Sequence, residues 1–240
     1  MKLHTFPTVQ VTKEAAKALN SLFTAQKGKN FLFLSSGGSS LKLLEEIDVS
    51  HFGPSSTIAV LDERYSEDPE TNNFAQLRKT EFYKATAARG AHFIDSRPLR
   101  GESIGSFAAR FEQKLKDWTA EAGADGEIIA SAGVGPDAHT SGIMPYPENH
   151  EFFDEKFDAA DSWIAFYDAQ GKNPHRMRIT TTFPFLRKIG AVVVYITGEA
   201  KRPALEALVS ENGTLYESPC RVWRELADPA NAEIYTDIVF

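Results

Sequence analysis

Short apolar runs alternate with longer amphipathic stretches along most of this 240-residue chain. Several runs are apolar at consecutive positions, which is typical of strands in a sheet that is covered on both faces. The longer stretches repeat apolar residues with helical spacing, and Gly28 and Gly123 follow two of them, as glycines often follow helix ends. Strands are predicted at residues 31–34, 57–61, 91–94, 127–130, 163–166 and 191–196, and helices at residues 13–26, 41–47, 73–87, 104–122 and 200–209.

This alternation predicts a doubly wound, mostly parallel α/β sheet with helices on both faces. Because the chain has no internal repeat, low-complexity tract or Pro/Ser-rich linker, we expect a single domain over residues 1–240. Residues 145–178 contain Pro145, Pro147 and Pro174 and form the most irregular segment. We expect this segment to be an excursion from the core that is too short for a second domain.

Charge and composition narrow the classes of function. The 26 Lys and Arg residues against 33 Asp and Glu give a net charge of −7, which disfavours general binding to nucleic acid or to acidic lipid. The longest strongly apolar stretch, residues 189–196, is far shorter than the ~20 residues that span a bilayer. The first residues lack an apolar signal core, so we expect a cytoplasmic protein. The single cysteine, Cys220, can form neither an internal disulfide nor a Cys-rich zinc site.

The segment after the first predicted strand is rich in small residues. In an open parallel sheet the ligand binds at the carboxyl ends of the strands, so the residues that follow each apolar run are informative. Small residues let backbone N–H groups approach an anion, serine hydroxyls can donate to it, and the following helix N-terminus favours negative charge. The alternative is an ordinary tight connection, and the Gly-Lys-Ser/Thr ending of an ATP-binding loop is absent. The candidate anion-binding residues are Gly37, Gly38, Ser39 and Ser40.

A charged triplet, Asp62-Glu63-Arg64, follows the second predicted strand. A carboxylate and a guanidinium at a strand end can serve as an acid or base and as a clamp for an oxyanion or a phosphate. The alternative is a local ion pair in a solvated loop.

Residues 131–142 combine the closely spaced Gly133 and Gly135 with Asp137 and His139. Dinucleotide binding is disfavoured, because Ala138 stands where the third glycine of that fingerprint belongs and Pro136 removes an N–H group. A histidine titrates near neutrality and can relay a proton, and a neighbouring carboxylate can orient its ring. The alternative is a surface or capping histidine.

Lys201 follows the last predicted strand and falls in the first turn of the next predicted helix. A cation is not needed there for the helix dipole, so this lysine is a candidate for contact with an anionic ligand. The alternative is a solvated lysine.

These four sites, in this order, resemble the family of 6-phosphogluconolactonases and glucosamine-6-phosphate deaminases. The resemblance covers most of the chain, through residues 36–39, 62–64, 71–72, 133–140, 178–180 and 197–201. The lactonase branch usually reads Asp-Gly-His-Thr-Ala-Ser-Leu-Phe-Pro where this chain has residues 137–145. The deaminase branch carries a glutamate just before that proline, whereas this chain has Met144. This difference and the Asp-Glu-Arg triplet place the chain nearer the lactonase branch.

The resemblance implies hydrolysis of 6-phosphogluconolactone to 6-phosphogluconate, a step of the pentose phosphate pathway, without a metal or a cofactor. His139 is the implied general base, Asp137 or Asp62 holds the imidazole or the water, and Arg64 stabilises the oxyanion with backbone N–H groups. The implied phosphate ligands are Gly37, Gly38, Ser39, Ser40 and Lys201, together with Arg178 or, in its place, Arg176.

Two other classes remain open: an isomerase or deaminase of amino-sugar phosphates, and a non-catalytic sugar-phosphate sensor. A sensor would normally carry a DNA-binding segment, and no basic segment precedes residue 30. We expect a small-molecule substrate and no nucleic-acid or membrane partner, while self-association is left undetermined. This chain departs from the family at Ala138, in place of a glycine, and at Leu41, in place of a proline. We expect a helical or extended backbone at Ala138, where alanine is harmless.

Overall fold

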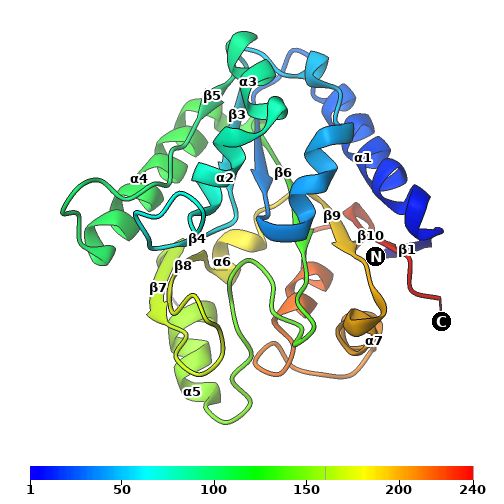
Figure 1. The fold of residues 1–240 in the computed structure, drawn as a ribbon, viewed down its shortest axis with the longest axis vertical. Helices are drawn as coiled ribbons and strands as arrows, with labels where there is room; N and C mark the ends of the chain where they lie inside the picture. Colours follow the sequence, from blue (N-terminus) through cyan, green and yellow to red (C-terminus); the bar gives the residue numbers. More distant parts are fainter. Residues whose placement is uncertain (160, 240) are drawn as a thin grey trace.

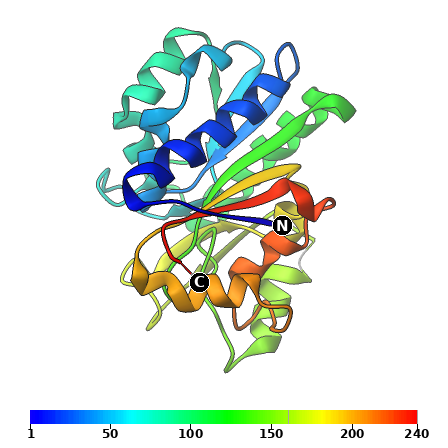
Figure 2. The same ribbon diagram turned by 90° about the vertical axis from the view of Figure 1, so that its right-hand side faces the viewer.

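A seven-stranded parallel sheet with helices on both faces forms the centre of the computed structural model (Figure 1), which describes residues 1–159 and 161–239. This architecture confirms the predicted fold class. The strand order is β1-β10-β9-β6-β2-β3-β5. β1 and β10 pair at one edge and run side by side between α1 and α7 (Figure 2). The strands are β1 (Lys2–Thr5), β2 (Phe31–Ser35), β3 (Ser56–Val60), β5 (His92–Phe93), β6 (Glu127–Gly133), β9 (Ala191–Ile196) and β10 (Ala232–Thr236).

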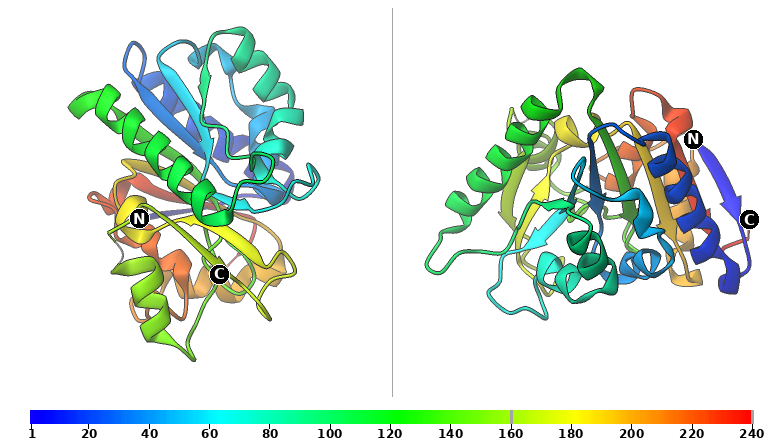
Figure 3. Two further views of the ribbon diagram at one scale, coloured as in Figure 1. Left: turned by 90° about the vertical axis from the view of Figure 1, so that its left-hand side faces the viewer. Right: turned by 90° about the horizontal axis from the view of Figure 1, so that it is seen from above.

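The two faces of the sheet bury alternate side chains, as the pleat of a strand requires. In β2, Phe31 and Phe33 join one hydrophobic cluster, whereas Leu32 and Leu34 join the other. Helices α1 and α4 lie on opposite sides of the sheet (Figure 3). One cluster includes residues of α1 (Thr8–Ala25), α2 (Asn73–Lys79) and α3 (Glu81–Ala88), and the other includes residues of α4 (Ile104–Ala122), α6 (Phe183–Leu186) and α7 (Arg202–Val209).

A second, antiparallel sheet has the order β4-β8-β7 and consists of β4 (Asp62–Arg64), β7 (Ile164–Asp168) and β8 (Met177–Thr181). Only Leu61 separates β4 from β3. The predicted strand at residues 163–166 is therefore a strand, but its expected place in the parallel sheet is wrong. Phe166 and Asp168 are exposed while their neighbours are buried, as in an antiparallel sheet with one open face.

Several element boundaries differ from the sequence prediction. The predicted helix at residues 41–47 is a 3₁₀ helix, Gly38–Glu46. The helix predicted at residues 73–87 is divided into α2 and α3 at Thr80, whose side chain caps α3. The irregular segment 145–178 includes α5 (His150–Phe153) and β7, and it runs into β8, so it builds most of the second sheet. Within the described residues, no helix is both long and apolar enough to cross a membrane.

Candidate active site

A cavity of about 220 Å³ opens at the carboxyl ends of β2 and β6. From β2 the chain continues to β3 and β5 on one side, and from β6 it continues to β9 and β10 on the other. Ligands bind in parallel sheets at such a reversal of strand order. Asp137, the partner of His139, is not among the residues that line the cavity. The other predicted site residues all line it: Gly37, Gly38, Ser39, Ser40, Asp62, Arg64, His139, Arg178 and Lys201.

Unpartnered polar atoms are concentrated in this cavity. Seven buried side-chain polar atoms of the described residues lack a hydrogen-bond partner, and five belong to residues that line it. Of these seven atoms, only His4 Nε2 belongs to a residue that lines either of two larger cavities, of about 470 and 640 Å³. Burial of a polar atom without a partner is costly, so this concentration indicates a site for a polar ligand. The five atoms are Ser40 Oγ, Arg64 Nε, Asn73 Oδ1, Ser141 Oγ and Arg178 Nε.

The glycine loop after β2 keeps its backbone open to the cavity. Ser36 Oγ accepts a hydrogen bond of 3.0 Å from the Gly133 N–H and thereby joins the ends of β2 and β6. A Cβ atom on Gly37 would lie 2.2 Å from Asn73 Oδ1, and Gly38 has a φ of +63°. Both positions therefore require glycine, which leaves backbone N–H groups accessible to an anion.

The segment after β6 folds back as a hairpin. The Gly135 N–H donates to the His139 carbonyl (2.9 Å), and the Ala138 N–H donates to the Gly135 carbonyl (3.0 Å). Ala138 has a φ of +66°, the left-handed conformation that typically ends a three-residue hairpin loop. The expectation of a helical or extended backbone at Ala138 is therefore wrong. Glycine adopts this conformation without strain, whereas the Cβ atom of alanine makes it costly.

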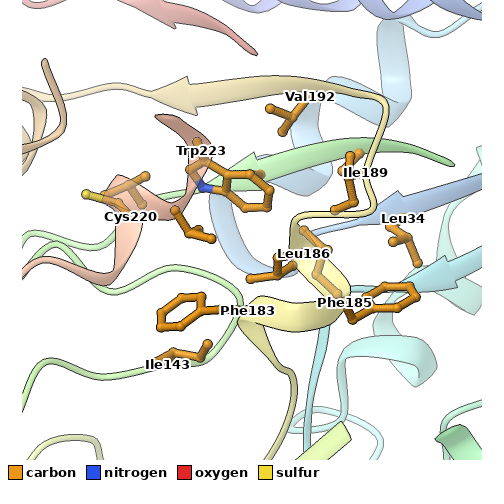
Figure 4. Packing of buried hydrophobic residues seen from close by; sticks show 14 of the residues in the cluster. Leu34, Ile143, Phe183, Phe185, Leu186, Ile189, Val192, Cys220 and Trp223 are labelled. Carbon is orange, nitrogen blue, oxygen red and sulfur yellow. The ribbon is translucent and has the colours of Figure 1, made fainter. Parts of the chain in front are cut away.

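Hydrogen bonds from two buried residues, Trp223 and Cys220, hold this hairpin in place. Trp223 Nε1 donates to Thr140 Oγ1 (3.1 Å), and Thr140 Oγ1 donates to the Gly133 carbonyl (2.9 Å). The Cys220 N–H donates to the Ala138 carbonyl at 3.0 Å. Trp223 and Cys220 come from the 3₁₀ helix Pro219–Arg224 and lie in the same hydrophobic cluster as Ile143 (Figure 4). The hairpin is thus fixed by a part of the chain more than 80 residues away.

His139 and Asp137 form a close pair on this hairpin. His139 Nδ1 lies 2.5 Å from Asp137 Oδ1. Burial alone would raise the pKa of Asp137, but the hydrogen bond and charge of His139 outweigh it and hold this pKa below its ordinary value. A carboxylate accepts, so Nδ1 carries the hydrogen and Nε2 is left as the basic nitrogen. A Cβ atom on Gly135 would lie 2.1 Å from the imidazole, so this glycine makes room for the ring.

Asp62 forms an ion pair with Arg178 and is not a partner of His139. Its Oδ2 lies 2.5 Å from Arg178 Nη2 in a buried ion pair, and Asn73 Nδ2 donates to its backbone carbonyl at 2.9 Å. Of the two carboxylates considered for holding the imidazole, only Asp137 contacts it. Arg64 faces Arg178 across β4 and β8. Burial lowers the pKa of Arg64, although a guanidinium keeps its charge near neutrality.

Glu63 is a buried carboxyl group that links β4 to the start of α2. It is fully buried and accepts hydrogen bonds from the N–H groups of Arg64 (2.8 Å), Asn73 (2.6 Å) and Phe74 (2.9 Å) and from Ser96 Oγ (3.0 Å). Burial raises its pKa to about 8, against the lowering effect of these N–H donors. Glu63 thereby fixes the start of α2 relative to β4.

The cavity has a net positive lining within an acidic protein. Lys201 lies just before α7, half-buried, and burial lowers its pKa, partly opposed by Asp237. Together with Arg64 and Arg178 it gives three cations, against the single lining carboxylate of Asp62. This balance favours an anionic ligand.

Three further observations complete the site. Arg176 pairs with exposed Asp168 and is not among the described residues of the lining, so Arg178 is the better placed of the two arginines. Asn73 and Ser141 line the cavity but were not predicted. In the sequence, Asn73 is only one of two adjacent asparagines at the start of a predicted helix, and nothing there distinguishes it from Asn72. In the structure, Asn72 is the residue that caps α2. The described residues contain no cluster of three or more His, Cys, Asp or Glu side chains placed to hold a metal.

Curated 6-phosphogluconolactonases are among the proteins similar in sequence to this chain. A curated 6-phosphogluconolactonase from Nostoc sp. is 28% identical over 224 residues, which is 89% of this chain and 86% of that protein. A probable 6-phosphogluconolactonase 1 from Arabidopsis thaliana is 31% identical over 102 residues, 42% of this chain and 35% of that protein.

Solved structures share the fold at lower identity. A 6-phosphogluconolactonase from Thermotoga maritima superposes with a TM-score of 0.70 at 19% identity, covering 98% of both chains. The enzyme of that name from Trypanosoma brucei gives 0.71 at 15% identity, covering 98% of this chain and 95% of that chain. The family model described as glucosamine-6-phosphate isomerases/6-phosphogluconolactonase matches residues 8–230. With its motifs gathered around one cavity, the chain belongs to the glucosamine-6-phosphate isomerase/6-phosphogluconolactonase family, and the predicted resemblance is confirmed.

Proposed function

We propose that this protein hydrolyses 6-phosphogluconolactone to 6-phosphogluconate. The observation that carries the proposal is the His139–Asp137 pair at the edge of a positively charged cavity with unpartnered polar atoms. An imidazole oriented by a carboxylate suits the activation of water, and the cationic lining suits a phosphorylated substrate. The names of the two curated relatives support the same reaction.

In the proposed mechanism, His139 Nε2 takes a proton from a water molecule as the water oxygen bonds to the lactone carbonyl carbon. Arg64 and backbone N–H groups of the 133–142 segment stabilise the negative charge that develops on the carbonyl oxygen. When the intermediate collapses, the bond from this carbon to the ring oxygen breaks, and His139 returns the proton to that oxygen. The new carboxyl group releases its own proton to solvent. All of these steps use side chains and backbone groups of the chain itself, without a metal.

The phosphate group is held at a distance from the carbonyl. Gly37, Gly38, Ser39 and Ser40 supply backbone N–H and hydroxyl donors, and Lys201 supplies a charge. Arg178 completes this set, although one of its nitrogens is already bound to Asp62. Binding energy from the phosphate then orients the lactone against His139.

Met144 argues against the deaminase reaction. It stands where the deaminase branch has its glutamate, and it is fully buried in the hydrophobic cluster. No carboxylate is therefore available from this position to assist opening of an amino-sugar ring.

The test compares both substrates with one protein preparation. The protein is incubated with 6-phosphogluconolactone while acid release is followed above the spontaneous rate, and with glucosamine 6-phosphate while ammonia release is followed. We expect acid release that is proportional to enzyme concentration, and no ammonia. Ammonia release without lactonase activity would replace the proposal with the deaminase reaction, and the absence of both would leave the sensor class.

A further inference from the structure

Asn73 is a buried residue whose side-chain oxygen has no partner. Its exposed fraction is 1%, it lines the cavity, and its Oδ1 contacts no hydrogen-bond donor of the described residues. An amide oxygen can accept two hydrogen bonds, and leaving it buried without any costs about 1–3 kcal/mol. The atom is therefore available to a ligand in this cavity.

The orientation of the amide follows from its neighbours. Asn73 Nδ2 lies 2.9 Å from the Asp62 carbonyl oxygen and 3.4 Å from Asp62 Oδ2. Both of these atoms only accept, so the NH₂ group must face them and the oxygen must face Gly37 and the cavity. The Asn73 N–H is in turn held by Glu63 at 2.6 Å, which fixes the residue at the start of α2.

The charge around the cavity limits what can donate to this oxygen. A phosphate dianion carries no hydrogen to donate. An ammonium group would be repelled by the nearby guanidinium groups of Arg64 and Arg178, which line the same cavity. A neutral hydroxyl group meets neither objection.

We propose that Asn73 Oδ1 accepts a hydrogen bond from one ring hydroxyl of the sugar-phosphate substrate and selects substrates that carry it. This inference rests on the proposed lactonase function and adds a specificity residue to it. A site built to bind a hydroxyl rejects an analogue that lacks it, because the buried acceptor is then left without a partner.

The test is a double-mutant cycle between protein and substrate. kcat/KM is measured for 6-phosphogluconolactone and for its three analogues that lack the hydroxyl at C2, C3 or C4. Wild type is compared with Asn73→Ala and with the matched control Asn72→Ala. Asn72 is equally buried and caps the same helix, but both polar atoms of its side chain have a partner. Its Oδ1 accepts from the Ala75 N–H (2.8 Å), and its Nδ2 donates to the Ser96 carbonyl (3.3 Å). Melting temperatures of all three proteins show that each is folded.

We expect wild type to prefer the lactone over one analogue by about tenfold or more. Asn73→Ala should lower kcat/KM for the lactone by a similar factor and reduce the preference to within about twofold. Asn72→Ala should lower the melting temperature but keep the preference. An equal loss on all four substrates in Asn73→Ala, a wild type that does not discriminate, or a lost preference in Asn72→Ala would each overturn the inference.

Failure of the lactonase proposal would be visible separately, as a wild type with no activity on any lactone. In that case the same cycle is run on binding, by calorimetric titration with 6-phosphogluconate and its 2-, 3- and 4-deoxy analogues. A preference that disappears only in Asn73→Ala would support the hydroxyl contact without the reaction. No preference, or no binding, would overturn the contact as well.

Discussion

Replacing Ala138 by glycine should relieve backbone strain in the hairpin that carries Asp137 and His139. At a φ of +66° an L-residue with a Cβ atom is strained by about 1–2 kcal/mol, and glycine removes this cost. Glycine also adds about 0.4–1 kcal/mol of unfolded-state entropy and loses a buried methyl group worth about 0.8 kcal/mol, since Ala138 is only 5% exposed. The three contributions nearly cancel, so we expect a change in unfolding free energy within about 1 kcal/mol of zero.

Comparison with a second buried alanine, which lies in a helix, separates the backbone strain from the loss of the methyl group. Ala108, in the second turn of α4, is also 5% exposed, and its replacement by glycine loses a similar methyl group. Glycine in a helix costs about 1 kcal/mol more than alanine, so Ala108→Gly should destabilise by about 2 kcal/mol. The difference between the two variants, about 1–2 kcal/mol, corresponds to about 2–8 °C in melting temperature for a chain of this size.

Thermal and denaturant unfolding of wild type, Ala138→Gly, Ala108→Gly and Ala138→Val provide the measurement. Valine should destabilise more than either glycine, because a β-branched residue is strongly disfavoured at positive φ. Ala138 is not among the described residues of the cavity lining, so lactonase turnover of Ala138→Gly should stay within about twofold of wild type. If Ala138→Gly were as destabilising as Ala108→Gly, or if valine were tolerated, the strain argument would be refuted.

Four other substitutions test the site. Lys201→Ala should raise KM for the phosphorylated lactone by about tenfold or more and weaken competition by inorganic phosphate; an unchanged KM would make this lysine a bystander. His139→Asn, which cannot accept a proton near neutrality, should lower kcat by about 10²–10⁴ with binding mostly intact, and a rate within threefold of wild type would contradict the general-base role. Burial raises the pKa of Glu63 from 4.5 to about 8, so its contribution to stability is complete below pH 4.5 and is lost as the pH rises through 8. Glu63→Gln should therefore flatten the fall of unfolding free energy between pH 5 and 8, and equal slopes in denaturant titrations would contradict this. Trp223→Phe removes the indole donor to Thr140 and should lower both the free energy of unfolding, by about 1 kcal/mol, and kcat. The control Trp163→Phe changes a half-buried tryptophan that is not among the lining residues of the cavity, and it should leave kcat unchanged.

The parallel sheet and the position of its binding edge could be predicted from the sequence. Consecutive apolar positions in residues 31–34 and 191–196 require cover on both faces, and each intervening helix reverses the direction of the chain. Every segment that follows a strand of the parallel sheet must then begin at the same edge. The glycine loop, His139 with its partner Asp137, and Lys201 consequently meet at one cavity. The sequence alone also excludes an internal disulfide, because Cys220 is its single cysteine.

Only the tertiary structure decided how the charged groups pair within that cavity. After Leu61 the chain leaves the parallel sheet and forms β4, which pairs with β8. This pairing brings Asp62 against Arg178, 116 residues away, so that Asp137 is the carboxylate that contacts the imidazole. The left-handed backbone of Ala138 depends on the hairpin closing between Gly135 and His139, and a local pattern that expects alanine to be helical or extended cannot indicate it. The periodicity of a sequence encodes which face of an element is buried. It does not encode the register between distant elements, because that register is set by packing and hydrogen bonding that exist only once the core has formed.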